Sequence, residues 1–286
     1  MRVSKRAVKG LVVLRPALFA LISSIALLTS CASTSERPDA WARESGLDNL
    51  AIAGGPFTLH AYERVTPGSH AHVFIEGDGR PWRSGGRIIS EDPTPKRLLV
   101  LGWMDKVPGP TLYLGRPCYF TSVADQSCDA LLWTYGRYSE LVVQSMATGL
   151  ESWLRLRPQI TSLTVVGHSG GGVLALLLAE RVVSVDQVIA VATPVDIDLW
   201  AAMHRYTPLF ASLNPARQHT WRKNVQRRLY FGEHDREVPP EAFLPAARAL
   251  PGVSVRIVEG VDHDCCGPDI WFVDPDRKSI TSQIKK

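Results

Sequence analysis

The sequence predicts an α/β fold in which a mostly parallel central sheet is covered by helices on both faces. Apolar runs of four to six residues alternate with longer segments of helical spacing, which is typical of such a sheet. Glycine and proline, 22 and 20 of the 286 residues, separate these runs. The composition is 45% apolar and 21% charged, which excludes a collagen, a disordered chain and a polytopic membrane protein.

The expected strands and helices follow one another along the chain. Short strands are expected at 57–65, 71–75, 111–114, 163–166, 188–192, 229–231 and 253–258, with the first at an edge of the sheet. The spacing of apolar residues predicts helices at 138–155, 171–182 and 239–250. Because functional groups gather at the carboxyl ends of parallel strands, the loops after these strands are the places to look for a site.

Residues 1–30 predict a lipoprotein signal peptide. They contain five basic residues and no acidic one, and the apolar stretch at 17–29 is shorter than the ~20 residues of a membrane-spanning helix. The sequence Leu28-Thr29-Ser30-Cys31 resembles a bacterial lipobox, which implies that Cys31 is lipidated and becomes the new N-terminus. The alternative is an ordinary signal peptide that happens to contain a cysteine.

The formal net charge of +4 comes from this segment. Without its five basic residues, 27 basic residues face 28 acidic ones, so nucleic acid is not an expected partner. Ala32 follows Cys31 in place of an aspartate, which in such lipoproteins favours the outer membrane. We expect a lipid-anchored protein of the bacterial cell envelope, facing the periplasm. Residues 31–50 are expected to form a polar tether before a domain at 51–286.

The other four cysteines belong to a compartment that oxidises thiols. Four cysteines allow three pairings. Cys118 and Cys128 close a short loop and are the first candidate pair. Long bridges from that loop to Cys265 and Cys266 are the alternative, because a bond between those two neighbours would need a strained ring. Neither pair has the C-x-x-C spacing of a metal site, and no metal or organic cofactor is expected.

One motif points to nucleophilic chemistry. Gly167-His168-Ser169-Gly170-Gly171 matches G-x-S-x-G, follows an apolar strand and opens an apolar helix. On such a tight turn a side chain at either flank would collide with the neighbouring strand or helix, which explains the glycines. The serine then lies at a helix N-terminus, where N–H groups face a developing anion. The alternative is a glycine-rich turn without catalysis.

With this motif, residues 57–275 resemble the α/β-hydrolase superfamily. The segment Gly232–Pro239 looks like the family's loop for the triad acid, which implies Asp235. Gly260-Val261-Asp262-His263 looks like the loop for the triad histidine, which implies His263. The order Ser169, Asp235, His263 is the family's order. The resemblance implies an α/β-hydrolase fold with a possible small cap.

Other residues compete for these roles. Asp196, after the strand at 188–192, is the alternative acid in a variant arrangement. His168 adjoins the serine, but in a tight elbow it points elsewhere and is expected to pack. Four further residues are expected to lie at the loop surface: Glu233, His234, Asp262 and Asp264.

The resemblance also implies an oxyanion hole made of two backbone N–H groups. One belongs to Gly170 and the other to Asp78, in the loop after the third strand of the family's fold. This chain has Glu76 where many family members have histidine. Because the carboxylate of Asp78 would oppose an oxyanion, we expect it to point away or to pair with Arg80 or Arg83.

Three stretches have no assigned catalytic role. Residues 113–118 and 133–139 resemble segments of one group of secreted bacterial α/β-hydrolases, in positions that would wall the site. Residues 195–227 lie where this fold often inserts a cap over the pocket. The alternative is a pair of surface helices that pack their aromatic side chains on the sheet. The aromatic and other large apolar side chains in question are Trp200, Met203, Tyr206, Phe210 and Trp221.

Together these features predict a lipid-anchored serine hydrolase that cleaves a carboxylic ester through an acyl-enzyme. Ser169 attacks the carbonyl carbon, His263 moves the proton, and Asp235 orients the imidazolium. The expected partners are a small acyl substrate and, through the lipid, the membrane. A thioesterase, an amidase or an acyltransferase with the same triad is an alternative. A non-catalytic lipoprotein on a hydrolase scaffold is an alternative of a different class.

Overall fold

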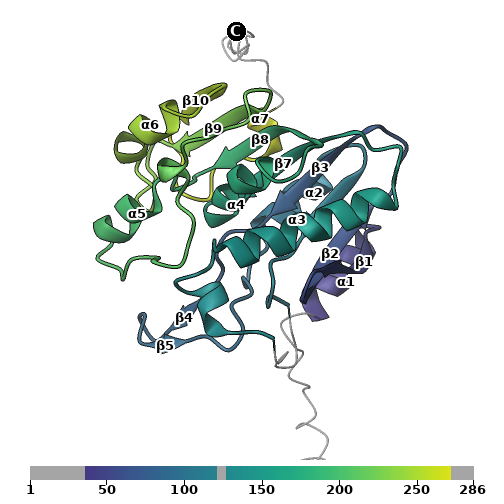
Figure 1. Cartoon of the computed structure of the whole chain (residues 1–286), viewed down its shortest axis with the longest axis horizontal. Helices are drawn as coiled ribbons and strands as arrows, with labels where there is room; N and C mark the ends of the chain where they lie inside the picture. The colour runs from purple at the N-terminus through teal and green to yellow at the C-terminus, as the bar shows by residue number, and fades with distance from the viewer. Residues whose placement is uncertain (1–35, 121–126, 272–286) are drawn as a thin grey trace, which may run out of the picture. The chain divides into compact units, whose positions relative to one another are not determined.

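The computed structural model describes residues 36–120 and 127–271, so the expected signal peptide and Cys31 lie outside the described residues. An eight-stranded sheet runs through the fold (Figure 1). Only the pairs β1·β2 and β2·β6 are antiparallel, and the other neighbours are parallel. The strands in sheet order are β1 (Asp48–Gly54), β2 (Phe57–Arg64), β6 (Thr111–Leu114), β3 (His70–Ile75), β7 (Ser162–His168), β8 (Val185–Val191), β9 (Gln226–Gly232) and β10 (Val253–Val258).

Helices cover both faces of this sheet. The helices are α1 (Glu36–Glu44), α2 (Leu99–Asp105), α3 (Glu140–Arg155), α4 (Gly170–Ala179), α5 (Ile197–Met203), α6 (Pro240–Arg248) and α7 (Pro268–Trp271). Residues of α3, α4 and α6 share one apolar cluster, and residues of α1, α2 and α7 share the other. A separate hairpin joins β4 (Trp82–Arg83) to β5 (Ile88–Ile89).

Alternate residues of the same strands pack into the two apolar clusters. In β7, Val165 points into one cluster and Val166 into the other, and in β3 the same holds for Val73 and Phe74. Side chains alternate across a strand, so a strand buried on both faces reads as a continuous apolar run. This is why such short runs marked the strands in the sequence.

The expected polar tether at 31–50 is wrong for its second half. Residues 36–44 form α1, and β1 begins at Asp48. Ala42 and Leu47 are buried in the cluster of α1, α2 and α7. The hydroxyl of Tyr62 on β2 donates to a carboxylate oxygen of Asp39 at 2.5 Å. A few buried apolar side chains therefore hold this mostly polar segment against the rest of the fold. The sheet edge, which was expected to be the strand that begins at residue 57, is formed by β1 instead.

Residues 195–227 contain a single α-helix and do not form the pair of surface helices considered as the alternative. They contain α5, a short 3₁₀ turn at Pro215–Arg217 and connecting loops. Ile197 and Leu209 are buried in the core, and Trp221 packs against it. Trp200 and Tyr206 line a cavity at the carboxyl ends of the strands. The segment thus packs on the core with one side and walls the cavity with the other.

Candidate active site

Ser169 occupies the turn between β7 and α4. Its φ of 52° lies in the left-handed region, and its N–H donates to the carbonyl of Val191 at 2.8 Å. Added Cβ atoms would lie 2.2 Å from a backbone oxygen at both Gly167 and Gly171. No side chain fits at either position, so this sequence builds the strained strand-to-helix turn that presents a serine at a helix N-terminus.

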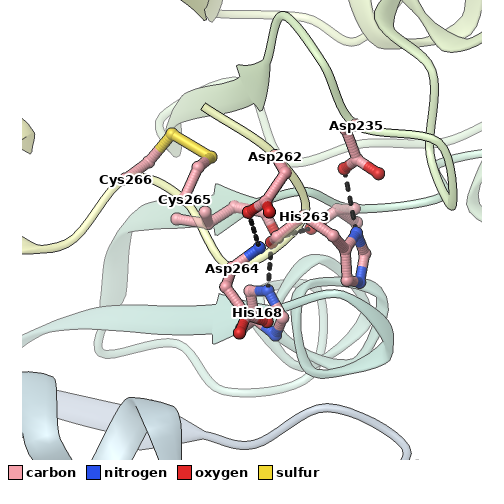
Figure 2. Close-up of a disulfide and its surroundings, with 9 residues drawn as sticks. His168, Asp235, Asp262, His263, Asp264, Cys265 and Cys266 are labelled. Atoms are coloured by element: carbon pink, nitrogen blue, oxygen red, sulfur yellow. Dashed lines mark hydrogen bonds and ion pairs between the residues drawn. A yellow bond between two sulfur atoms is a disulfide. The ribbon is translucent and has the colours of Figure 1, made fainter. Parts of the chain in front are cut away.

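His263 meets Asp235 between two loops. Its Nδ1 lies 2.9 Å from Oδ2 of Asp235, whose side chain is fully buried (Figure 2). The other carboxylate oxygen accepts backbone N–H groups of Glu237 and Val238 at 2.9 and 2.8 Å. Burial by itself would raise the pKa of Asp235, but the bonds from His263 and from the backbone outweigh it and lower that pKa. Asp235 is thus held as a carboxylate facing the imidazole.

Ser169 and His263 line one cavity of about 1050 Å³. Within the described residues, no hydrogen bond joins the serine hydroxyl to the imidazole. Such bonds are often long in free enzymes and shorten when substrate binds. The loops after β7, β9 and β10 therefore bring Ser169, Asp235 and His263 to the same edge of the sheet, as their order in the chain predicts.

His168, expected only to pack, contacts the loop of His263 directly. Its Nε2 lies 2.8 Å from the backbone carbonyl oxygen of His263 (Figure 2). A carbonyl only accepts, so the ring donates. Burial, followed by the neighbouring His263, lowers the pKa of His168 to about 4. The ring is therefore neutral, and it also makes a T-shaped contact with the ring of Trp103 at a centroid distance of 5.7 Å.

The expected partners of Asp78 are wrong. Its two carboxylate oxygens accept from Nη1 of Arg116 and Nη1 of Arg137, each at 2.8 Å, and from the hydroxyl of Tyr138. Burial alone would raise the pKa of Asp78, but the two guanidinium groups outweigh it and lower the pKa to about 2. Neither Arg80 nor Arg83 pairs with it, and Arg83 lies 3.5 Å from Glu91 instead.

This network gives a role to the two undeciphered segments. Residues 113–118 supply Arg116, and residues 133–139 supply Arg137. Arg116 also donates to the carbonyl of Glu76 at 3.0 Å, and the hydroxyl of Tyr119 donates to the carbonyl of Asp78 at 2.9 Å. Both arginines are buried. In each segment a Gly-Arg pair within an apolar or aromatic stretch is the sequence signal that could have pointed to a buried charge, although it does not identify the partner.

The two expected oxyanion donors lie beside this network. Within the described residues, the N–H groups of Asp78 and Gly170 have no hydrogen-bond acceptor. A Cβ added to Gly170 would lie 1.9 Å from Oδ1 of Asp78 and 2.3 Å from the hydroxyl of Tyr138. The carboxylate is thus packed directly on the glycine. Its charge is balanced by Arg116 and Arg137, which removes the electrostatic objection to a nearby oxyanion.

Glu76 takes the place of the family's usual histidine and serves a structural purpose. Its carboxylate is buried and accepts the N–H groups of Val100 and Leu101 at the start of α2, at 2.7 and 3.3 Å. Burial raises the pKa of Glu76 to about 7, although the backbone N–H groups and Arg116 oppose the rise. The loop that carries Asp78 is thereby fastened to α2.

Two disulfides are present in the described residues. Cys118 joins Cys128, the pair favoured by the sequence, with Cα atoms 5.6 Å apart. The second joins the neighbours Cys265 and Cys266, whose Cα atoms are 3.7 Å apart, and replaces the long bridges considered as the alternative (Figure 2). Cys266 has a φ of 68°, and this left-handed backbone accommodates the small ring. The ring begins two residues after His263.

The remaining candidates have other contacts. Asp196 accepts the N–H groups of Asp198 and Leu199 and caps α5, and the carboxylate that His263 contacts is that of Asp235. Asp264 pairs with Arg97 at 2.6 Å. The other three are exposed, as expected: Glu233, His234 and Asp262.

Between residues 36–120 and 127–271, no group of three or more His, Cys, Asp or Glu side chains is placed to hold a metal ion. None of the helices described there has the length and apolar character needed to cross a membrane.

Comparison with known proteins places this geometry in a family. The model of the PGAP1-like alpha/beta domain matches residues 119–271, more than half of the chain. The chain belongs to the PGAP1-like alpha/beta domain family. The eight-stranded sheet and its order make this family member an α/β-hydrolase, as the motifs indicated. A search of curated proteins finds no match.

Solved structures share the fold of this PGAP1-like domain at low identity. A membrane phospholipase A described as a bacterial virulence factor aligns with a TM-score of 0.55 and 15% identity over 89% of this chain and 91% of that one. An esterase of Pyrococcus furiosus aligns at 0.54 and 11% over 78% and 84%. An acylaminoacyl peptidase of Pyrococcus horikoshii aligns at 0.51 and 17% over 76% and 37%. These likenesses show a fold that hydrolases use.

Proposed function

We propose that the protein is a serine hydrolase that cleaves a carboxylic ester through Ser169, His263 and Asp235. The observation that carries the proposal is the 2.9 Å contact of His263 Nδ1 with the buried carboxylate of Asp235, in a loop whose imidazole lines the same cavity as Ser169. Because Nδ1 is engaged, the proton-accepting position left on the ring is Nε2. A strained serine turn supports the same assignment.

The reaction proceeds through an acyl-enzyme. His263 Nε2 takes the proton of Ser169 as its oxygen attacks the carbonyl carbon, and Asp235 stabilises the imidazolium. The N–H groups of Asp78 and Gly170 receive the negative charge that forms on the carbonyl oxygen. The imidazolium then protonates the leaving alcohol. In the second half, a water molecule loses a proton to His263 and attacks the acyl carbon. The bond to the Ser169 oxygen breaks, the imidazolium returns the proton to that oxygen, and the acid leaves.

We further propose that Cys31 carries a lipid and anchors the enzyme to the bacterial cell envelope. The lipobox-like sequence supports this, and two disulfides fit an oxidising compartment. Mass spectrometry of the mature protein is expected to find acyl chains on Cys31. The Cys31→Ala variant is expected either to be absent from the membrane fraction or to remain an unprocessed precursor. An unmodified wild type in the soluble fraction would contradict the anchor and leave the hydrolase proposal intact.

The test of the catalytic proposal is Ser169→Ala. We expect hydrolysis of p-nitrophenyl esters to fall by several orders of magnitude and labelling by a fluorophosphonate to disappear, with an unchanged circular dichroism spectrum. Ser254→Ala, at an exposed position of β10, is the matched control and should retain both. Wild-type turnover in Ser169→Ala would refute the nucleophile. A wild type that neither turns over esters nor takes the label would favour the non-catalytic alternative.

A further inference from the structure

Two segments that line the cavity also carry exposed apolar side chains. The β4–β5 hairpin, whose Trp82 lines the cavity, carries Ile88 and Ile89. Residues 203–210, whose Tyr206 lines the cavity, carry Met203, Tyr206 and Phe210. Tyr206 is 53% exposed and Phe210 is 72% exposed. In Figure 1 the hairpin and α5, just before the second segment, lie on the same side of the view. These five residues are called the rim below.

Ring contacts join the two segments across the mouth. The indole of Trp82 on β4 meets the ring of Tyr135 at a centroid distance of 5.7 Å, and Tyr135 stacks on Phe210 at 5.1 Å. Trp82 and Tyr135 also line the cavity that contains Ser169. Ring contacts therefore connect Phe210 of the rim to two aromatic side chains that line the cavity. A second aromatic contact, Trp200 with Tyr206 at 5.3 Å, extends these contacts on the side of α5.

The rim is accompanied by arginines that lack acidic partners. Arg80 and Arg205 line the cavity mouth, and Arg87 lies in the β4–β5 hairpin. All three are exposed, and none forms an ion pair with a described residue. Arg205 has a φ of 56°, a conformation costly for a residue other than glycine. The three acids that line the cavity are engaged elsewhere: Asp78 by Arg116 and Arg137, Asp264 by Arg97, and Glu76 by the backbone N–H groups at the start of α2.

Several exposed apolar side chains gathered beside polar or charged ones are typical of an interaction surface. At a lipid surface, aromatic and aliphatic side chains enter the region between headgroups and acyl chains, while guanidinium groups bind phosphates. The positive charge distinguishes such a surface from the apolar face of another protein copy, because two copies would bring like charges together.

We propose that the rim binds an anionic phospholipid surface and that the cavity opens onto it. Docking requires only the rim and its arginines. That an acyl ester passes from the lipid layer to Ser169 rests on the proposed function. The two parts are separable by experiment.

The binding test uses the chain from Thr34 to Lys286, which forms a compact unit distinct from residues 1–33 and lacks Cys31. Sedimentation with vesicles of phosphatidylcholine, with and without one third phosphatidylglycerol, gives the partition coefficient. We expect binding to the mixed vesicles to be roughly 100-fold stronger, since each of three arginines near an anionic surface contributes about fivefold. Arg80→Gln with Arg205→Gln should reduce this difference to the roughly fivefold that Arg87 supplies, whereas Arg155→Gln with Arg248→Gln should keep it in full.

The apolar part is tested by Ile88→Ser with Phe210→Ser. This pair should weaken binding to both vesicles at least tenfold, because two exposed side chains no longer enter the lipid. Val65→Ser with Val183→Ser is the control, since both valines are more than half exposed and lie outside the rim. The proposal is overturned if the wild type does not sediment with the vesicles or if the control pair loses as much. It also fails if the chain is a dimer that the rim pair dissociates.

Ester hydrolysis separates this inference from the proposed function. Ile88→Ser with Phe210→Ser should hydrolyse a short soluble p-nitrophenyl ester at the wild-type rate, and Ser169→Ala should bind vesicles like the wild type. If the wild type hydrolyses no ester, the proposed function is refuted. The lipid-binding proposal would then be judged by the sedimentation data alone.

Discussion

The imidazole of His168 donates a hydrogen bond to the backbone carbonyl oxygen of His263, 2.8 Å away. The side chain next to the candidate nucleophile thus holds the backbone of the candidate base. The two rings also meet edge to face at a centroid distance of 4.9 Å. Since the chain around Ser169 is fixed by the elbow, this bond relates the positions of the serine and the histidine across two loops.

His168→Phe keeps an aromatic ring and removes the donor. We expect kcat for a p-nitrophenyl ester to fall about tenfold with little change in KM, because misplacing the base affects the reacting geometry more than ground-state binding. The free energy of unfolding should fall by about 1–3 kcal/mol for the unsatisfied carbonyl. His234→Phe, at an exposed position, is the control. Unchanged kcat in His168→Phe would show that the bond has no positioning role.

Arg116→Met removes one of the two guanidinium groups that balance Asp78. Removing one partner of a buried pair costs about 3–5 kcal/mol, because the remaining charge loses its compensation. Urea denaturation should show this loss. Arg83→Met is the control, since Arg83 is 45% exposed and lies 3.5 Å from Glu91, which is 92% exposed, and the change should cost at most about 1 kcal/mol. Equal losses in the two variants would contradict the importance of the Asp78 network.

The two disulfides should differ in what they stabilise. Cys118 and Cys128 are ten residues apart, so replacing both with serine should cost about 2–3 kcal/mol of unfolding free energy through the freed loop. Cys265 and Cys266 are adjacent and close no such loop, but they directly follow the segment of His263. Serine at both positions should lower kcat several-fold with a small change in stability. Urea denaturation and ester kinetics measure the two effects. If replacing Cys265 and Cys266 lowered stability and left kcat unchanged, the adjacent pair would have a purely structural role.

Much of the fold can be predicted from the pattern of apolar residues along the chain, whereas the contacts within the candidate site cannot. The strands at 163–166 and 71–75 were visible because a strand buried on both faces is apolar throughout, and the G-x-S-x-G turn has its own steric logic. The partners of Asp78 lie 38 and 59 residues away, on loops whose course over the sheet is set by tertiary packing. No local pattern carries that information.

Two further differences have the same kind of cause. Residues 36–44 are mostly polar, and their helix depends on Ala42 and on Asp39 meeting Tyr62, contacts supplied by the rest of the fold. The bond between Cys265 and Cys266 depends on a left-handed backbone at Cys266, which the residue type does not announce. Local propensity is overridden at each of these places by neighbours that are distant in the chain.

Asp235→Asn and Asp196→Asn decide which carboxylate is the acid. Asparagine at 235 would hold His263 in the wrong tautomer, so kcat should fall by up to ~10⁴ with the fold intact. Asp196 caps α5 and accepts the side-chain amide of Asn214 at 2.9 Å, and asparagine is also a good cap, so that variant should lose little activity. If the losses came in the opposite order, the acid would belong to the loop after β8.

Glu76→Gln tests the buried carboxyl that fastens the oxyanion loop to α2. Its pKa is raised from 4.5 to about 7 by burial, so the folded state binds the proton more tightly than the unfolded chain does. This contribution to stability is present below pH 4.5 and is lost as the pH rises through 7. The shift corresponds to about 3 kcal/mol.

His168 acts in the opposite direction, because its pKa is lowered to about 4 and its contribution grows as the pH rises towards 6.5. The informative quantity is therefore the unfolding free energy of Glu76→Gln minus that of the wild type, in which the contribution of His168 cancels. Measured by urea denaturation, this difference should increase by about 3 kcal/mol between pH 4.5 and pH 8, since glutamine cannot ionise. Glu259→Gln, at an exposed position, should show no such trend. Parallel pH profiles for Glu76→Gln and the wild type would mean that Glu76 is ionised in the folded protein throughout this range.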